Sequence, residues 1–217
     1  MVAILSETDV EEIEPMRFFT TPRIVRLFYP SLIWEMPKGD KKIYLTFDDG
    51  PHPTITHRVL ELLKKFDAKA TFFCVGNNVN KYKDTFELIV KEGHSIGNHT
   101  YNHDNGWNTS TRNYDTSVYE AGESIDSVLL RPPHGRITRA QIKCLKDDFK
   151  LIAWTVISYD WDKSLSPDDC FNNVIKRSGD GSIIVFHDSE KAEKNMIPTL
   201  ERVLEYYSEK GFSFEKL

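Results

Sequence analysis

The chain has 217 residues, of which 40% are hydrophobic and 28% are charged, and its 28 basic and 33 acidic residues give a formal net charge of −5. This composition predicts an ordinary folded core and excludes the basic surface that nucleic-acid binding requires, while no apolar run approaches the length of a transmembrane helix. The N-terminus lacks the pattern of a secretory signal, which favours a cytoplasmic location; an envelope or periplasmic location stays open if a signal has been trimmed.

An acidic extension begins the chain. Residues 1–15 contain no Lys or Arg, and their five acids account for the whole net negative charge: Glu7, Asp9, Glu11, Glu12 and Glu14. We expect a weakly ordered arm there, with an ordered strand or helix packed against the fold as the alternative. Because no Pro-, Gly- or Ser-rich linker divides the remainder, residues 16–217 are expected to form a single domain.

Strand-like and helix-like segments alternate along the rest of the sequence. Strands are expected at 42–47, 69–75, 94–98, 128–131, 150–155, 182–187 and 212–215. Helices are expected at 54–66, 80–92, 113–127, 138–148, 167–178 and 192–210. In the first helix, apolar residues recur at helical spacing and should face the sheet: Ile55, Val59, Leu62, Leu63 and Phe66. Repeated strand-then-helix order predicts parallel strands and an α/β fold.

Two adjacent carboxylates, Asp48 and Asp49, end the first strand at a Gly-Pro turn. Adjacent strand residues point to opposite faces, so only a bend directs both acids into one site. One carboxylate could then bind a cation while the other acts as a base on the same water. The alternative is an ordinary acidic turn, since Asp and Gly are common turn residues.

Two histidines four residues apart, His99 and His103, follow the third predicted strand. On one helical turn they would share a face and reach one ion. An Asp and two His leave open positions on a metal, which is typical of a catalytic rather than a structural zinc site. Chance spacing of surface histidines is the alternative for this pair taken alone.

Ionisable residues also end the later strands. Arg131 leads into a rigid Pro-Pro turn, Asp160 precedes Trp161, and His187 ends an apolar run. We expect Arg131 to be held in place, with a purely structural ion pair as the alternative role. Three cysteines without paired spacing, at Cys74 in an apolar run and at Cys144 and Cys170 in expected helices, indicate buried thiols and a reducing compartment.

These motifs, in this order, resemble the polysaccharide deacetylases of carbohydrate esterase family 4, whose domain is also found in chitooligosaccharide deacetylases. The resemblance spans about Lys42 to Leu217. It rests on T-F-D-D-G-P at 46–51, H-x-x-x-H at 99–103, the arginine-proline turn at 131–135, D-W at 160–161 and the terminal strand histidine, His187. Five motifs, each at a strand end, form a highly specific pattern.

The resemblance implies a distorted, incomplete (β/α)7 barrel with catalytic groups at the C-terminal ends of its strands. It implies a metal-dependent hydrolase that removes acetyl groups from N-acetylated amino sugars of a peptidoglycan- or chitin-like polymer. The implied metal ligands are Asp49, His99 and His103. Zn²⁺ is the expected cation, and Co²⁺, Ni²⁺ or Mn²⁺ are alternatives because they accept the same ligand types.

The same resemblance implies roles for the other motif residues. Asp48 would be the general base, Arg131 its partner, and His187 a general acid oriented by Asp160. The backbone N–H of His134 would stabilise the oxyanion, although many relatives carry Tyr at this position. Sugars stack on aromatic rings, so the groove is expected to use Trp161 and Trp107, with plain packing as the alternative for Trp107.

One departure bears on activity: relatives commonly carry D-x-x-D-W in the fourth motif, and Ile157 replaces the first of these acids. A catalytically weak or inactive carbohydrate-binding relative therefore stays open, as does a deacylase acting on O-acetyl esters or formylated sugars. A metal-independent enzyme of the same fold that attacks cyclic amides is disfavoured, since such relatives tend to lose the His pair. We expect His52, His94 and Asp188, all near motifs, either to support the site residues from behind or to be structural.

Overall fold

The computed structural model describes residues 19–217, so the acidic extension at residues 1–15 lies outside the described part of the chain. All paired strands run parallel in one sheet. The described strands are β1 (Leu32–Ile33), β2 (Lys42–Asp48), β3 (Ala70–Cys74), β4 (Ser95–Asn98), β5 (Leu129–Leu130), β6 (Lys150–Ile152), β7 (Val156–Ile157), β8 (Ser182–His187) and β9 (Ser213–Phe214).

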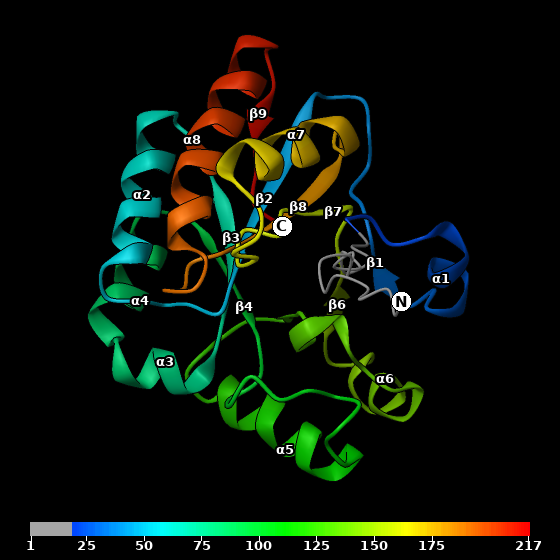
Figure 1. The fold of residues 1–217 in the computed structure, drawn as a ribbon. Helices are drawn as coiled ribbons and strands as arrows, with labels where there is room; N and C mark the ends of the chain where they lie inside the picture. Colours follow the sequence, from blue (N-terminus) through cyan, green and yellow to red (C-terminus); the bar gives the residue numbers. More distant parts are fainter. Residues whose placement is uncertain (1–18) are drawn as a thin grey trace, which may run out of the picture.

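The sheet has the order β1-β6-β5-β4-β3-β2-β8-β7, with β9 paired to β2 at one end. It curls around a common interior, and helices lie outside it (Figure 1). Within residues 19–217, the edge strands β1 and β7 do not pair with each other, so the ring stays open there. This arrangement confirms the expected incomplete (β/α) barrel.

The helices connect the strands as parallel crossovers require. They are α1 (Arg23–Phe28), α2 (Ile55–Lys65), α3 (Gly76–Lys81), α4 (Lys83–Lys91), α5 (Thr111–Gly122), α6 (Arg139–Leu145), α7 (Pro167–Arg177) and α8 (Glu193–Glu209), with a 3-10 turn η1 (Pro133–Gly135). The single helix expected at 80–92 is wrong, because two helices cover this region. α3 begins at Gly76, and Tyr82, with φ −125° and ψ 53°, interrupts the helical conformation before α4. None of the described helices is long and apolar enough to cross a membrane.

Strand periodicity explains which residues face the barrel interior. In β2, Ile43, Leu45 and Phe47 belong to the outer core, whereas Tyr44 belongs to the inner cluster. Side chains of a strand alternate between its two faces, so Asp48 shares the inner face with Tyr44. In β8 the same alternation places Ile184 and Phe186 outward and His187 inward.

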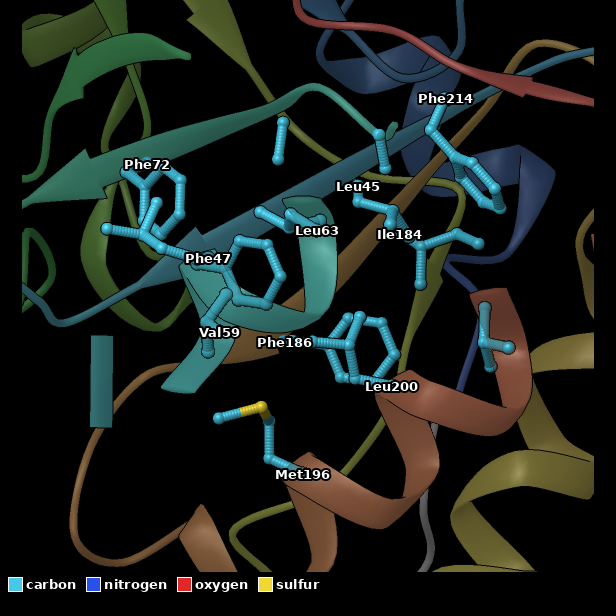
Figure 2. Packing of buried hydrophobic residues seen from close by; sticks show 14 of the residues in the cluster. Leu45, Phe47, Val59, Leu63, Phe72, Ile184, Phe186, Met196, Leu200 and Phe214 are labelled. Atoms are coloured by element: carbon cyan, nitrogen blue, oxygen red, sulfur yellow. The ribbon is translucent and has the colours of Figure 1, made fainter. Parts of the chain in front are cut away.

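The outer core packs β2, β3 and β8 against α2 and α8. Figure 2 shows Phe47 and Phe186 close to Val59 of α2 and to Met196 and Leu200 of α8. The expected sheet-facing residues of α2 hold for Ile55, Val59 and Leu63, which are buried, and Leu62 and Phe66 pack there while partly exposed. This rigid layer fixes the strand ends that carry the site.

The segment before β2 was not expected to be ordered secondary structure, yet it covers the open side of the barrel. The backbone N–H of Ile157 donates to the carbonyl of Phe19 at 3.0 Å, and that of Ala153 donates to Ile33 at 2.8 Å. The N–H of Met36 donates to Gly181 at 2.8 Å. Residues 19–36 therefore join β6, β7 and the start of β8.

Candidate active site

The two consecutive carboxylates at the end of β2 lie in the same site. Asp48 is the last residue of β2 and is buried. Asp49 has φ +81°, a left-handed conformation that non-glycine residues adopt at a cost of about 1–3 kcal/mol. This turn of the backbone brings the Asp49 carboxylate within 3.9 Å of His99, while Asp48 lies 4.0 Å from the same imidazole nitrogen.

The spacing of His99 and His103 predicts that they share a helical turn, but in the structure they do not. They lie in the loop after β4, where Thr100 has φ +62° and His103 has φ +60°. Two left-handed residues fold this loop back, so the imidazole centroids are 5.0 Å apart. The histidines therefore converge by loop geometry, and the helical explanation is wrong.

Nitrogen and oxygen donors converge at Asp49, His99 and His103, whose potential ligand atoms all lie within 4.8 Å of one another. His103 Nε2 is 3.1 Å from Asp49 Oδ1. Nδ1 of His99 is 2.7 Å from the carbonyl oxygen of Arg131; a carbonyl only accepts, so Nδ1 carries the proton and Nε2 keeps its lone pair. This donor set fits a divalent metal such as zinc.

Protonation states at this cluster also suit metal binding, because ligands must be deprotonated. Burial lowers the pKa of His99 to about 4, which outweighs the opposing charge of Asp48 and leaves the imidazole neutral at pH 7. Burial alone would raise the pKa of Asp49, but the hydrogen bond from His103 and the charge of His187 bring it well below its usual range. Asp49 is therefore a carboxylate.

Arg131 follows β5 and is completely buried against Asp48. Its Nη1 lies 2.8 Å from Asp48 Oδ1 and 2.6 Å from the hydroxyl of Thr46, and Nη2 donates to the carbonyl of Ala153 at 3.1 Å. The guanidinium also lies 4.1 Å from the centre of the Phe73 ring. Burial lowers the pKa of Arg131, and the charge of Asp48 opposes this. These contacts leave Asp48 little freedom to rotate.

His187, at the end of β8, pairs with Asp160. The distance from His187 Nδ1 to Asp160 Oδ1 is 2.8 Å, and Asp160 Oδ2 accepts the backbone N–H of His187 at 2.8 Å. Burial would lower the pKa of His187, but the charge and hydrogen bond of Asp160 outweigh it and raise the pKa to about 9. The imidazole is therefore cationic at neutral pH. Trp161 lies edge-on to it at 4.6 Å between ring centroids.

A cavity of about 820 Å³ opens over these groups. Its lining includes Asp48, Asp49, His99, His103 and His187, with His134, Trp161, Trp107 and Ile157 among the other walls. Asp160 and Arg131 lie behind this surface. Nearly all sequence-predicted site residues therefore border or support one cavity.

Three further residues, His134, Trp107 and Ile157, lie around the edge of the cavity. His134 has φ +58°, and its ring is 4.5 Å from that of His103. Trp107 is 60% exposed and carries the guanidinium of Arg136 over its ring at 5.1 Å, so it is not a core residue. Ile157 lines the cavity and forms part of its apolar wall beside the N-terminal segment.

Several residues around the site were missed or undervalued. Thr46 contacts Arg131 from the inner face of β2, a position that strand alternation could have indicated. Asn78 of α3 donates from its Nδ2 to the carbonyl of Asp49 at 2.8 Å, and no motif in the local sequence indicates this contact. Asp188 is buried next to the Gly50 backbone. Cys144 is exposed, so the expectation that all three thiols are buried is wrong for it.

Comparison with known proteins gives the same class. Residues 35–148 match the family model for polysaccharide deacetylase. A peptidoglycan-N-acetylglucosamine deacetylase of Bacillus cereus is 33% identical over 189 residues, which cover 83% of this chain and 88% of the relative. The chain thus belongs to the polysaccharide deacetylases, carbohydrate esterase family 4, and is a metal-dependent hydrolase.

Two solved structures of this family are similar to the chain over most of its length. The Bc1960 peptidoglycan N-acetylglucosamine deacetylase, in complex with 4-naphthalen-1-yl-N-oxidanyl-benzamide, has a TM-score of 0.83 at 31% identity and covers 91% of this chain and 95% of its own. A family 4 acetyl xylan esterase from Clostridium thermocellum, in complex with a cobalt ion, has a TM-score of 0.74 at 27% identity, covering 81% and 88%.

Proposed function

We propose that this protein hydrolyses the acetamido group of N-acetylated amino sugars in a peptidoglycan- or chitin-like polysaccharide. The observation that carries the proposal is the position of Asp48. It is locked by Arg131 at 2.8 Å, yet lies within 4.0 Å of an imidazole in the Asp49–His99–His103 cluster. A carboxylate that is held beside a candidate metal site, but is not one of its ligands, is suited to accept a proton from water.

Asp49, His99 and His103 would hold the metal, and zinc is our choice for it. A divalent cation bound there would polarise the acetyl carbonyl and acidify a water molecule. Mixed nitrogen and carboxylate ligands favour zinc, and cobalt is the ion named with the related acetyl xylan esterase. His99 supports this assignment because its Nδ1 contact leaves only Nε2 free to bind.

Asp48 would act as the general base. The buried guanidinium of Arg131 pairs with the Asp48 carboxylate at 2.8 Å and fixes its direction. Thr46 and the Ala153 carbonyl hold the guanidinium in turn, so the base cannot swing away from the site. Restricting the base in this way lowers the cost of reaching the reactive geometry.

His187 would act as the general acid that protonates the departing amine. Its raised pKa keeps the proton available at neutral pH, and Asp160 holds the ring from behind. The backbone N–H of His134 would donate to the developing oxyanion, a role that does not depend on the side chain. The replacement of Tyr by His is therefore compatible with turnover.

Trp161 and Trp107 would contact the sugar chain. Trp161 forms an aromatic wall with Tyr159, at 4.8 Å between ring centroids, directly beside His187. Trp107 also borders the cavity, and its ring is exposed. Two separate aromatic surfaces that border one cavity suit a substrate longer than one sugar.

Ile157 does not remove any group from the proposed constellation. The Asp160–His187 pair forms without an acid at position 157, which supports an active enzyme over a silent carbohydrate-binding relative. The cytoplasmic location stays a prediction. Action on assembled peptidoglycan would instead require access to the cell envelope, and fractionation with antibodies would separate the two.

The test is a screen for acetate release from chitooligosaccharides, peptidoglycan and acetylated xylan, each with and without a chelator. We expect chelator-sensitive release from an N-acetylated amino-sugar polymer. Release from acetylated xylan alone would replace the amide substrate with an ester. No release from any of them by metal-loaded protein would support the silent relative.

A further inference from the structure

One peptide unit in the site, between Asp49 and Gly50, is held from both sides by side chains outside the five motifs. Its carbonyl oxygen accepts from Nδ2 of Asn78 at 2.8 Å. Its N–H donates to Oδ1 of Asp188 at 3.1 Å. The plane of this peptide is thereby fixed at both polar ends, directly after the proposed metal ligand.

The Asp188 side of this arrangement is rigid. Asp188 is 1% exposed, and its other oxygen accepts from the hydroxyl of Thr56. That hydroxyl accepts in turn from the backbone N–H of His52 at 2.8 Å, so one carboxylate ties both ends of the 50–56 turn. A Cβ on Gly50 would lie 2.2 Å from Asp188 Oδ2, and only glycine lets the backbone approach this closely.

The conformation of Asp49 needs such support. Its φ of +81° is unfavourable for an aspartate, and a strained backbone persists only where its surroundings hold it. The orientation of the following peptide limits where the Asp49 carboxylate can point relative to Asp48. Relaxation of this peptide toward an extended conformation would turn the carboxylate away from His103, which now lies 3.1 Å from it.

We infer that Asn78 and Asp188 are positioning residues that hold the Asp49–Gly50 peptide and so set the affinity of the site for its metal. The inference rests on the proposed assignment of Asp49 as a ligand. Partners of metal ligands in other proteins change metal affinity by roughly 10–100-fold when they are removed, and we expect an effect in this range.

The experiment measures the dissociation constants of Zn²⁺ and Co²⁺ for metal-stripped protein by competition with a chelator. Asn78→Ala should weaken both by roughly 10–100-fold. Asn78 is half-buried, so this variant is expected to fold. Asn195→Ala is the matched control: Asn195 also donates from Nδ2 to loop carbonyls, those of Asp162 and Leu165, but that loop carries no proposed ligand. It should lose stability and keep wild-type metal affinity.

Asp188 is tested by a pair of variants. Asp188→Ala should weaken metal binding as Asn78→Ala does, whereas Asp188→Asn keeps an acceptor for the Gly50 N–H and should restore most of the affinity. Wild-type affinity in Asn78→Ala would overturn the inference while leaving the proposed function intact. Equal losses in Asn78→Ala and Asn195→Ala would reduce the effect to general stability. A wild-type protein that binds no metal would overturn the proposed function itself.

Discussion

Asp160 binds His187 twice, through Nδ1 of the ring and through the backbone N–H, both at 2.8 Å. The two contacts place a carboxylate directly behind the imidazole and raise the pKa of His187 to about 9. A folded-state pKa above the unfolded value of 6.5 stabilises the folded protein fully below that value, and the contribution disappears as the pH rises through about 9.

We therefore predict a pH-dependent effect of Asp160→Asn on the metal-stripped protein. The substitution should cost roughly 3 kcal/mol of unfolding free energy at about pH 6, and this charge-dependent part should vanish near pH 10. Urea denaturation of both proteins at the two pH values checks it. A stability difference that does not change with pH would mean that His187 is not held as a cation.

Asp48→Asn tests the division of labour between the two adjacent acids. Asparagine keeps the shape of Asp48 but cannot accept a proton, so acetate release should fall by roughly 10²–10⁴-fold. Metal content should stay at the wild-type level, because the proposed ligands are untouched. Near-normal acetate release from a fully loaded variant would remove Asp48 as the base.

Arg131→Leu tests whether the Arg131–Asp48 ion pair contributes to the free energy of unfolding as a buried pair does. Removing the cation leaves an uncompensated carboxylate in the interior, which typically costs about 3–5 kcal/mol. Urea unfolding of the variant near neutral pH measures this loss. Adding Asp48→Asn to Arg131→Leu should recover part of it. A loss below about 1 kcal/mol, the range of exposed pairs, would contradict the buried geometry.

His187→Ala should affect substrates according to their leaving groups. An amine must be protonated to depart, whereas an activated phenolate ester needs little help from an acid. The rate on an N-acetylated oligosaccharide should therefore fall much more than the rate on a nitrophenyl acetate. Parallel assays on one preparation give the ratio, and equal losses would argue for a structural role of His187.

The central strands β2, β3 and β8 could be predicted from the sequence because they lie in apolar runs and have 7, 5 and 6 residues. Asp48 and His187 fall at matched strand ends, and β2 and β8 pair them directly. The elements α1, β1 and β7 were not predicted because their 6, 2 and 2 residues are too few to show a periodic pattern. Long-range bonds hold this region instead, such as the bond from Ile157 to Phe19.

In the site, too, sequence patterns identified residues but did not predict the geometry that long-range contacts produce. Spacing brought attention to His99 and His103 but suggested the wrong geometry, because the loop depends on left-handed residues and on bonds such as that from the Thr100 N–H to Asn98 Oδ1 at 2.8 Å. Asn78 has no signal in its local sequence, since its role depends on the approach of α3 to the end of β2. Long-range support of this kind becomes visible only in three dimensions.

The most direct test of the account is the metal content of purified protein, measured by elemental analysis for wild type, His103→Ala and His57→Ala. His57 contacts Thr85 on the outer helices and serves as the histidine control. We predict about one divalent ion per chain in wild type and His57→Ala, and strongly reduced occupancy in His103→Ala. Full occupancy in His103→Ala would contradict the proposed ligand set, and metal-free wild type that still releases acetate would contradict the mechanism.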